Sequence, residues 1–124
     1  MLKRGFKQML AEANAAIETV SVQDLQYLLD DSEVVLVDVR DAYERETDGQ
    51  IPGSIHVSRG LLEFQADPDS PVYNPSLSPE RRIVLYCGTG GRSALAAKTL
   101  LDMGYTDVAS LAGGYAAWQQ AKTG

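Results

Sequence analysis

The chain of 124 residues, with a mass of 13.4 kDa, has the length of a single domain. Its 17 acidic and 11 basic residues give a net charge of −6, which argues against a nucleic-acid partner because such binding needs a basic face. One cysteine excludes an internal disulfide, and with one histidine it cannot build a closed structural zinc site, which takes about four nitrogen or sulfur ligands.

No segment of the sequence is predicted to cross a membrane. The longest apolar block, residues 34–37, is far shorter than the roughly 20 residues that a membrane span needs. The basic start at Lys3 and Arg4 is not followed by a long apolar run, so it does not resemble a secretory signal. A lone thiol fits a reducing compartment, and we therefore expect a cytoplasmic protein without a membrane partner.

Residues 1–20 carry apolar side chains at the spacing of one helix face: Phe6, Met9, Leu10, Ala13, Ile17 and Val20. We predict an N-terminal helical extension over residues 1–20 that leans on the core or on a protein partner, followed by the main domain over 21–124. In that domain Ser21 is expected to cap a second helix, with Asp24 reaching back to the cap and the helix ending near Leu29.

The main domain alternates strands and helices. The β-branched run from Val34 to Val39 predicts a strand buried on both faces. We then predict a short helix over residues 41–49, a short strand over 54–57 and a helical turn over 60–64. Residues 66–79 contain four prolines and are predicted to form a surface loop. In the second half, strands are predicted over residues 82–86 and 108–111. A helix over 93–103 lies between them and ends at Gly104, and a terminal helix follows from residue 113 onward. This alternation predicts an α/β fold with a mainly parallel sheet.

Cys87 stands at the end of the strand over 82–86, where ligands bind in parallel sheets. The next residues, Gly88-Thr89-Gly90-Gly91-Arg92-Ser93, lead into a helix. Glycine-loop amides and a helix N-terminus favour an anion, and a guanidinium adds a permanent positive charge. This setting favours a thiolate nucleophile at Cys87, against the alternative of a small buried apolar residue. A dinucleotide loop would need glycine where Ser93 stands, and no lysine completes a P-loop.

Other residues receive roles from their position after strands. Asp38 and Arg40 follow a buried strand, and we expect them to brace the cysteine loop and the next helix by hydrogen bonds. Arg59 also follows a strand end and is a further candidate for contact with a substrate. His56 is interpreted as structural, and the acidic residues within 24–48 as an ordinary solvated surface.

Four segments together resemble a known family: Val37-Asp38-Val39-Arg40 with Glu44, the run from Gly49 to Ile55, the loop from Cys87 to Ser93, and Gly113-Gly114 with Trp118. In this order and spacing they resemble a single-domain rhodanese of the thiosulfate sulfurtransferase superfamily, over about residues 20–121. Gln50 departs from the family pattern, which has histidine there.

The resemblance implies a three-layer fold, with a mainly parallel sheet between helices, and a sulfurtransferase that needs no cofactor or metal. Cys87 would take a sulfane sulfur from an anionic donor such as thiosulfate and pass it, as a persulfide, to a thiol or cyanide acceptor. The residues implied in binding the donor are Gly88, Thr89, Gly90, Gly91, Arg92 and Ser93.

Two alternatives remain at this point. One is a persulfide carrier or protein-interaction module with little activity on free thiosulfate, docking its partner through residues 1–20. The other is a phosphatase or arsenate reductase, but Cys87 and Arg92 are spaced C-x4-R, whereas rhodanese-like phosphatases carry C-x5-R. The shorter loop favours a sulfane sulfur over a tetrahedral phosphate.

Overall fold

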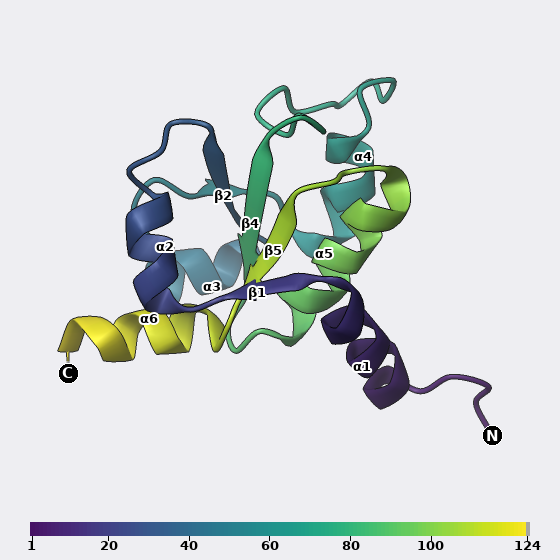
Figure 1. Cartoon of the computed structure of the whole chain (residues 1–124), viewed down its shortest axis with the longest axis horizontal. Coiled ribbons are helices and arrows are strands. Elements are labelled where there is room, and N and C mark those ends of the chain that lie inside the picture. Colours follow the sequence, from purple (N-terminus) through teal and green to yellow (C-terminus); the bar gives the residue numbers. More distant parts are fainter. Residues whose placement is uncertain (124) are drawn as a thin grey trace.

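The computed structural model describes residues 1–123 and forms a five-stranded parallel sheet between two layers of helices (Figure 1). The strands are β1 (Glu18–Val20), β2 (Val34–Asp38), β3 (Ile55–His56), β4 (Arg82–Tyr86) and β5 (Val108–Leu111), in the order β1-β5-β4-β2-β3. The helices are α1 (Phe6–Ala16), α2 (Val22–Leu28), α3 (Ala42–Asp48), the 3-10 turn η1 (Arg59–Leu61), α4 (Leu62–Ala66), α5 (Gly91–Met103) and α6 (Gly114–Thr123). The predicted α/β class and the parallel sheet are confirmed.

The two faces of the sheet carry separate cores because successive strand residues point to opposite sides. On β4, Ile83 and Leu85 pack with α4 and α5, and Cys87 just beyond the strand joins the same cluster. Val84 and Tyr86 point the other way, into a cluster with α2 and α6. Figure 1 shows α5 and α6 on opposite sides of the sheet. The thiol therefore lies on the α5 side, where the next helix begins.

The prediction of one helix through residue 20 is wrong. The helix ends at Ala16, Ile17 is extended, and residues 18–20 form β1, which pairs with β5. Thr19 and Val20 are β-branched and favour a strand where a sheet edge is available. Arg82 also holds Glu18, with Nη2 2.6 Å from Oε1. The N-terminal segment thus contributes an edge strand to the sheet in addition to a helix.

The remaining predicted elements are found with shifted ends. The helix expected from Ser93 begins at Gly91, and the strand expected over 54–57 contains only residues 55 and 56. Ser21 caps α2 as predicted, because its Oγ accepts a hydrogen bond from the Asp24 amide at 3.0 Å. Within the described residues, no helix has the length and apolar character required to cross a bilayer.

Candidate active site

The side chain of Cys87 is 1% exposed, and hydrogen-bond donors converge on its sulfur. The amides of Gly90 and Ser93 donate to Sγ at 3.1 Å and 3.4 Å, and Ser93 Oγ lies 3.5 Å from Sγ. Burial opposes ionisation, but the Ser93 hydroxyl and the amides of Ser93, Gly90 and Thr89 outweigh it, so the pKa of Cys87 lies below its ordinary value. An inert buried cysteine would not need these donors.

The cysteine loop is held in place by the first turn of α6. The amides of Tyr115 and Ala116 donate to the carbonyl oxygens of Cys87 and Gly88 at 2.8 Å and 3.1 Å. This close approach requires glycine at position 114, since a Cβ there would lie 2.5 Å from the Cys87 oxygen. Gly114 therefore allows α6 to approach the loop that carries the thiol.

Arg92 lies in the first turn of α5 beside this loop, but its guanidinium is already paired. Nη1 and Nη2 donate to the two oxygens of Glu44 at 2.6 Å and 2.9 Å. The hydrogen bond from Arg92 lowers the pKa of Glu44, and Glu44 raises the pKa of Arg92. Interpreting Glu44 as part of a solvated acidic surface was wrong. Two features of the sequence could have indicated a specific role for Glu44: it belongs to the motif that includes Arg40, and it lies three residues after the helix cap at Asp41.

A buried polar network lies under the loop on the opposite face of the sheet. Arg40 donates to Asp38 through Nε at 3.0 Å and Nη2 at 2.8 Å, and both side chains are almost fully buried. Arg45 and the Tyr86 hydroxyl donate to the same carboxylate at 3.0 Å and 3.1 Å. Burial raises the pKa of Asp38, but the hydrogen bonds and charge of Arg40 and the hydrogen bond from Arg45 reverse this, and the net shift is downward.

The same network reaches the segment that anchors the loop. The Arg40 guanidinium lies 4.5 Å from the ring centre of Tyr115 and 5.5 Å from that of Tyr86. Tyr86 precedes Cys87 in the chain, and the Tyr115 amide holds the Cys87 carbonyl. Asp38 and Arg40 therefore lie where the predicted bracing role would place them. His56 supports the same turn, with Nε2 2.6 Å from the Arg40 oxygen.

Arg59 is directed elsewhere. Its guanidinium donates to Glu63 Oε1 and to Thr99 Oγ1, each at 3.0 Å. It lines a pocket of about 260 Å³ together with residues of α1 and α5, among them Glu12 and Lys98. The structure does not bring the Arg59 guanidinium to the Arg92–Glu44 pair.

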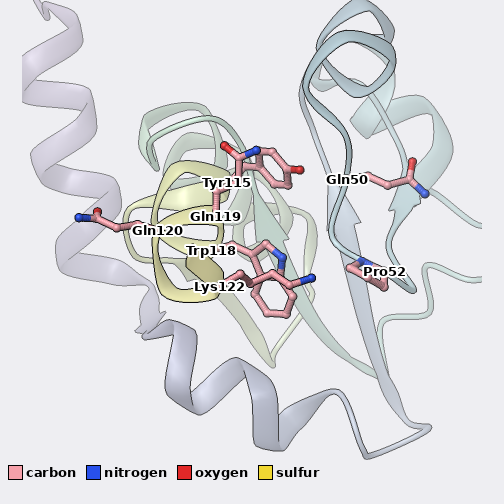
Figure 2. A pocket seen from close by; sticks show the side chains of 7 residues that line it. All are labelled: Gln50, Pro52, Tyr115, Trp118, Gln119, Gln120 and Lys122. Atoms are coloured by element: carbon pink, nitrogen blue, oxygen red, sulfur yellow. The ribbon is translucent and has the colours of Figure 1, made fainter. Parts of the chain in front are cut away.

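Two other pockets lie near the cysteine loop and α6. A polar pocket of about 230 Å³ joins the N-terminal segment to the cysteine loop: it is lined by Leu10, Asn14, Thr19, Thr89, Gly90, Gly91, Ser110, Leu111, Ala112 and Gly113. Sequence reasoning did not foresee this contact, because nothing in the pattern of residues 1–20 shows where the helix packs. A wider groove of about 580 Å³ lies between α6 and the segment with Gln50 and Pro52, and Figure 2 shows Tyr115, Trp118 and Lys122 on its α6 wall. No residue of the 87–93 loop lines that groove.

Among the described residues, no group of three or more His, Cys, Asp or Glu side chains is arranged to hold a metal ion. The chemistry available at the site is that of a cysteine sulfur surrounded by hydrogen-bond donors, with a paired guanidinium and carboxylate beside it.

The chain is similar to several known proteins over most of its length. The thiosulfate sulfurtransferase GlpE of Pseudoalteromonas translucida is 31% identical over 107 residues, 86% of this chain and 92% of the relative. The polysulfide-sulfur transferase homodimer of Wolinella succinogenes is 33% identical, with a TM-score of 0.75 over 94% of this chain and 83% of that one.

A structure from Rhodopseudomonas palustris is more similar still. It is described as a protein of unknown function and possible tyrosine phosphatase, and it is 48% identical with a TM-score of 0.93 over 98% of this chain and 94% of that one. Because the match covers nearly the whole chain, it includes most of the N-terminal segment. The model of the rhodanese-like domain matches residues 21–121, and the chain belongs to the rhodanese-like domain family.

Proposed function

We propose that this protein is a sulfurtransferase that moves a sulfane sulfur from thiosulfate or a similar anionic donor to a thiophilic acceptor through a persulfide on Cys87. The observation that carries the proposal is the convergence of the Gly90 and Ser93 amides on Cys87 Sγ, in a chain of the rhodanese-like family. Amide donors around a buried sulfur stabilise the negative charge of a thiolate on it, which favours the nucleophile. The relatives named as sulfurtransferases support the same reaction class.

The first half-reaction loads the enzyme. The Cys87 thiolate attacks the outer sulfur of thiosulfate, a new bond forms between Sγ and that sulfur, and the bond between the two thiosulfate sulfurs breaks. Sulfite leaves with the bonding electron pair. The loop amides from Gly88 to Ser93 would hold the negative charge of the persulfide, and Arg92 would attract the anionic donor.

The second half-reaction unloads it. A thiolate or cyanide attacks the outer sulfur of the persulfide, the sulfur–sulfur bond breaks, and its electron pair returns to Sγ as the Cys87 thiolate. The product is an acceptor persulfide or thiocyanate. Because the chain has one cysteine, no second thiol of the same chain can resolve the persulfide as an internal disulfide, and the acceptor must come from outside.

Supporting residues complete the proposal. Asp38 and Arg40 would act from beneath the loop, by fixing Tyr86 and Tyr115 on either side of Cys87. The contact of Arg59 with a substrate, the partner surface on residues 1–20 and the cytoplasmic location stay predictions. No cofactor takes part in the scheme.

Intact-mass spectrometry after thiosulfate treatment tests the proposal directly. The native protein should gain one sulfur atom, lose it on addition of cyanide, and release thiocyanate. C87S is the matched control, because it keeps the side-chain size while removing the nucleophile. Native protein that gains no sulfur from thiosulfate or from polysulfide would rule the proposal out.

A phosphatase is the second candidate, favoured by the description of the similar Rhodopseudomonas palustris structure. One feature opposes it here: the loop from Cys87 to Arg92 is one residue shorter than a C-x5-R loop. Hydrolysis of an aryl phosphate by the native protein but not by C87S would favour this candidate over sulfur transfer.

A further inference from the structure

Two serine hydroxyls form a buried chain behind the cysteine. Ser93 Oγ and Ser110 Oγ lie 2.8 Å apart, and their residues are 0% and 3% exposed. Ser93 belongs to the first turn of α5, whereas Ser110 lies on β5 and is 17 residues farther along the chain. Only Ser93 continues the chain to the thiol, with Oγ 3.5 Å from Cys87 Sγ.

The number of protons in this cluster limits what each hydroxyl can do. A serine hydroxyl has one proton to donate and two lone pairs to accept with. Ser93 Oγ has three neighbours: while Cys87 is a thiol, Ser93 Oγ accepts a hydrogen bond from Sγ and donates to the Gly90 carbonyl oxygen at 3.2 Å, and Ser110 Oγ is the third neighbour. That carbonyl only accepts, and so does Cys87 once it is a thiolate. Ser93 can donate to the thiolate only if its single proton turns from the Gly90 oxygen to the sulfur and is not given to Ser110. Ser110 must then be the donor toward Ser93.

We infer that Ser110 is a positioning residue for the sulfur chemistry: it donates its hydroxyl proton to Ser93 Oγ and thereby leaves the Ser93 proton for the sulfur of Cys87. Ser110 does not touch the reacting sulfur, so its effect passes through Ser93. A hydroxyl that accepts one hydrogen bond becomes a stronger donor in the next, and the effect is largest where water is excluded. The lowered pKa of Cys87, to which the Ser93 hydroxyl contributes, agrees with this arrangement.

This inference rests on the proposed role of Cys87 as the nucleophile, but its test needs no sulfur donor. The thiolate fraction of Cys87 is followed from acid to alkaline pH by its ultraviolet absorbance, with C87S as the blank. The rate of alkylation by iodoacetamide provides a second curve. This probe is uncharged, so the charges of Arg92 and Glu44 neither attract nor repel it.

We expect S93A to raise the apparent pKa of Cys87 by roughly one unit, because a hydrogen bond to a charged group is lost. S110A should raise it by roughly half a unit, since only the support of that bond is lost. In the S93A background, adding S110A should produce no further shift, because the residue through which Ser110 acts is gone.

S110T is the conservative variant and should restore the native pKa. It keeps the hydroxyl, threonine suits a strand, and Ser110 lines a pocket of about 230 Å³. S78A, at a half-buried serine of the long surface loop, controls for the loss of any serine hydroxyl and should leave the curve unchanged.

Three results would each overturn the inference: an unchanged pKa in S110A, a lowered pKa in S110A, or a shift of equal size in the S93A background. A lowered pKa would mean that Ser110 takes the Ser93 proton. An equal shift would mean that it acts on the thiol independently of Ser93. Failure of the native protein to load sulfur would count against the proposed function alone, because the titration does not depend on transfer.

Discussion

Arg92 and Glu44 form a two-pronged ion pair, with Nη1 2.6 Å from Oε1 and Nη2 2.9 Å from Oε2. They lie 48 residues apart in the chain, at the starts of α5 and α3. The cation that the sequence offers to an anionic donor is therefore partly neutralised before any donor arrives. A donor must either share this guanidinium with Glu44 or compete for it.

Removing the charge of Glu44 should strengthen the attraction of thiosulfate. In E44Q the glutamine can still reach the Asp41 amide that Glu44 caps at 3.1 Å, so α3 should keep its start. An ion pair exposed to this degree contributes roughly 0.2–1 kcal/mol, which corresponds to a KM for thiosulfate lower by about 1.5- to 5-fold. Initial rates of thiocyanate formation against thiosulfate concentration measure it.

The control is E33Q, because Glu33 pairs with Arg81 on another part of the surface. Its KM should equal that of the native protein. A KM that rises in E44Q would mean instead that Glu44 holds Arg92 in its working position.

Removing the guanidinium itself should weaken donor binding. R92A is expected to raise the KM for thiosulfate by about 10-fold or more, since a hydrogen bond to a charged group is worth roughly 1.5–3 kcal/mol. R92K should recover part of this loss, because an ammonium keeps the charge but not the two-pronged geometry. Steady-state kinetics with R81A as the control would decide it, and a KM unchanged in R92A would remove Arg92 from the donor site.

The buried carboxylate of Asp38 should matter for stability. D38N would leave the Arg40 guanidinium, which is 1% exposed, without its charged partner, and breaking a buried ion pair costs about 3–5 kcal/mol. Urea denaturation should show this loss in the free energy of unfolding. D102N, which breaks the exposed pair with Lys98, should cost less than about 1 kcal/mol. Similar costs for the two variants would contradict the assigned burial.

Gly114 offers a test of the contact between α6 and the cysteine loop. A Cβ at this position would lie 2.5 Å from the Cys87 oxygen, and the backbone has a φ of +60°. Gly53 has a φ of +84° with nothing within 4 Å of its Cβ position, so G53A carries the conformational cost alone, about 1–2 kcal/mol.

G114A should therefore lower the free energy of unfolding more than G53A and should slow alkylation or sulfur loading of Cys87 in the protein that remains folded. Thermal unfolding and intact-mass kinetics on both variants provide the comparison. Equal effects of the two substitutions would show that the loop does not depend on this close approach.

Much of the fold follows from local pattern. The β-branched run at 34–39 and the apolar run at 82–86 predict buried strands wherever they lie in a protein, and a glycine loop after a strand predicts a ligand site at the strand end. For the same reason Cys87 could be singled out before its surroundings were known. The start of α2 could also be predicted, because the capping Ser21 and the Asp24 amide that it binds are only three residues apart.

What the sequence by itself determined was the order of strands and helices and the chemical type of the loop around Cys87, because these depend on neighbours within a few residues. Only the tertiary structure decided that residues 18–20 join the sheet, that Glu44 pairs with Arg92, that Arg59 turns to Thr99 and that Ser110 meets Ser93. Each of these contacts joins segments far apart in the chain. These contacts form only when the strands and helices pack together, and that packing cannot be inferred from the type and spacing of neighbouring side chains.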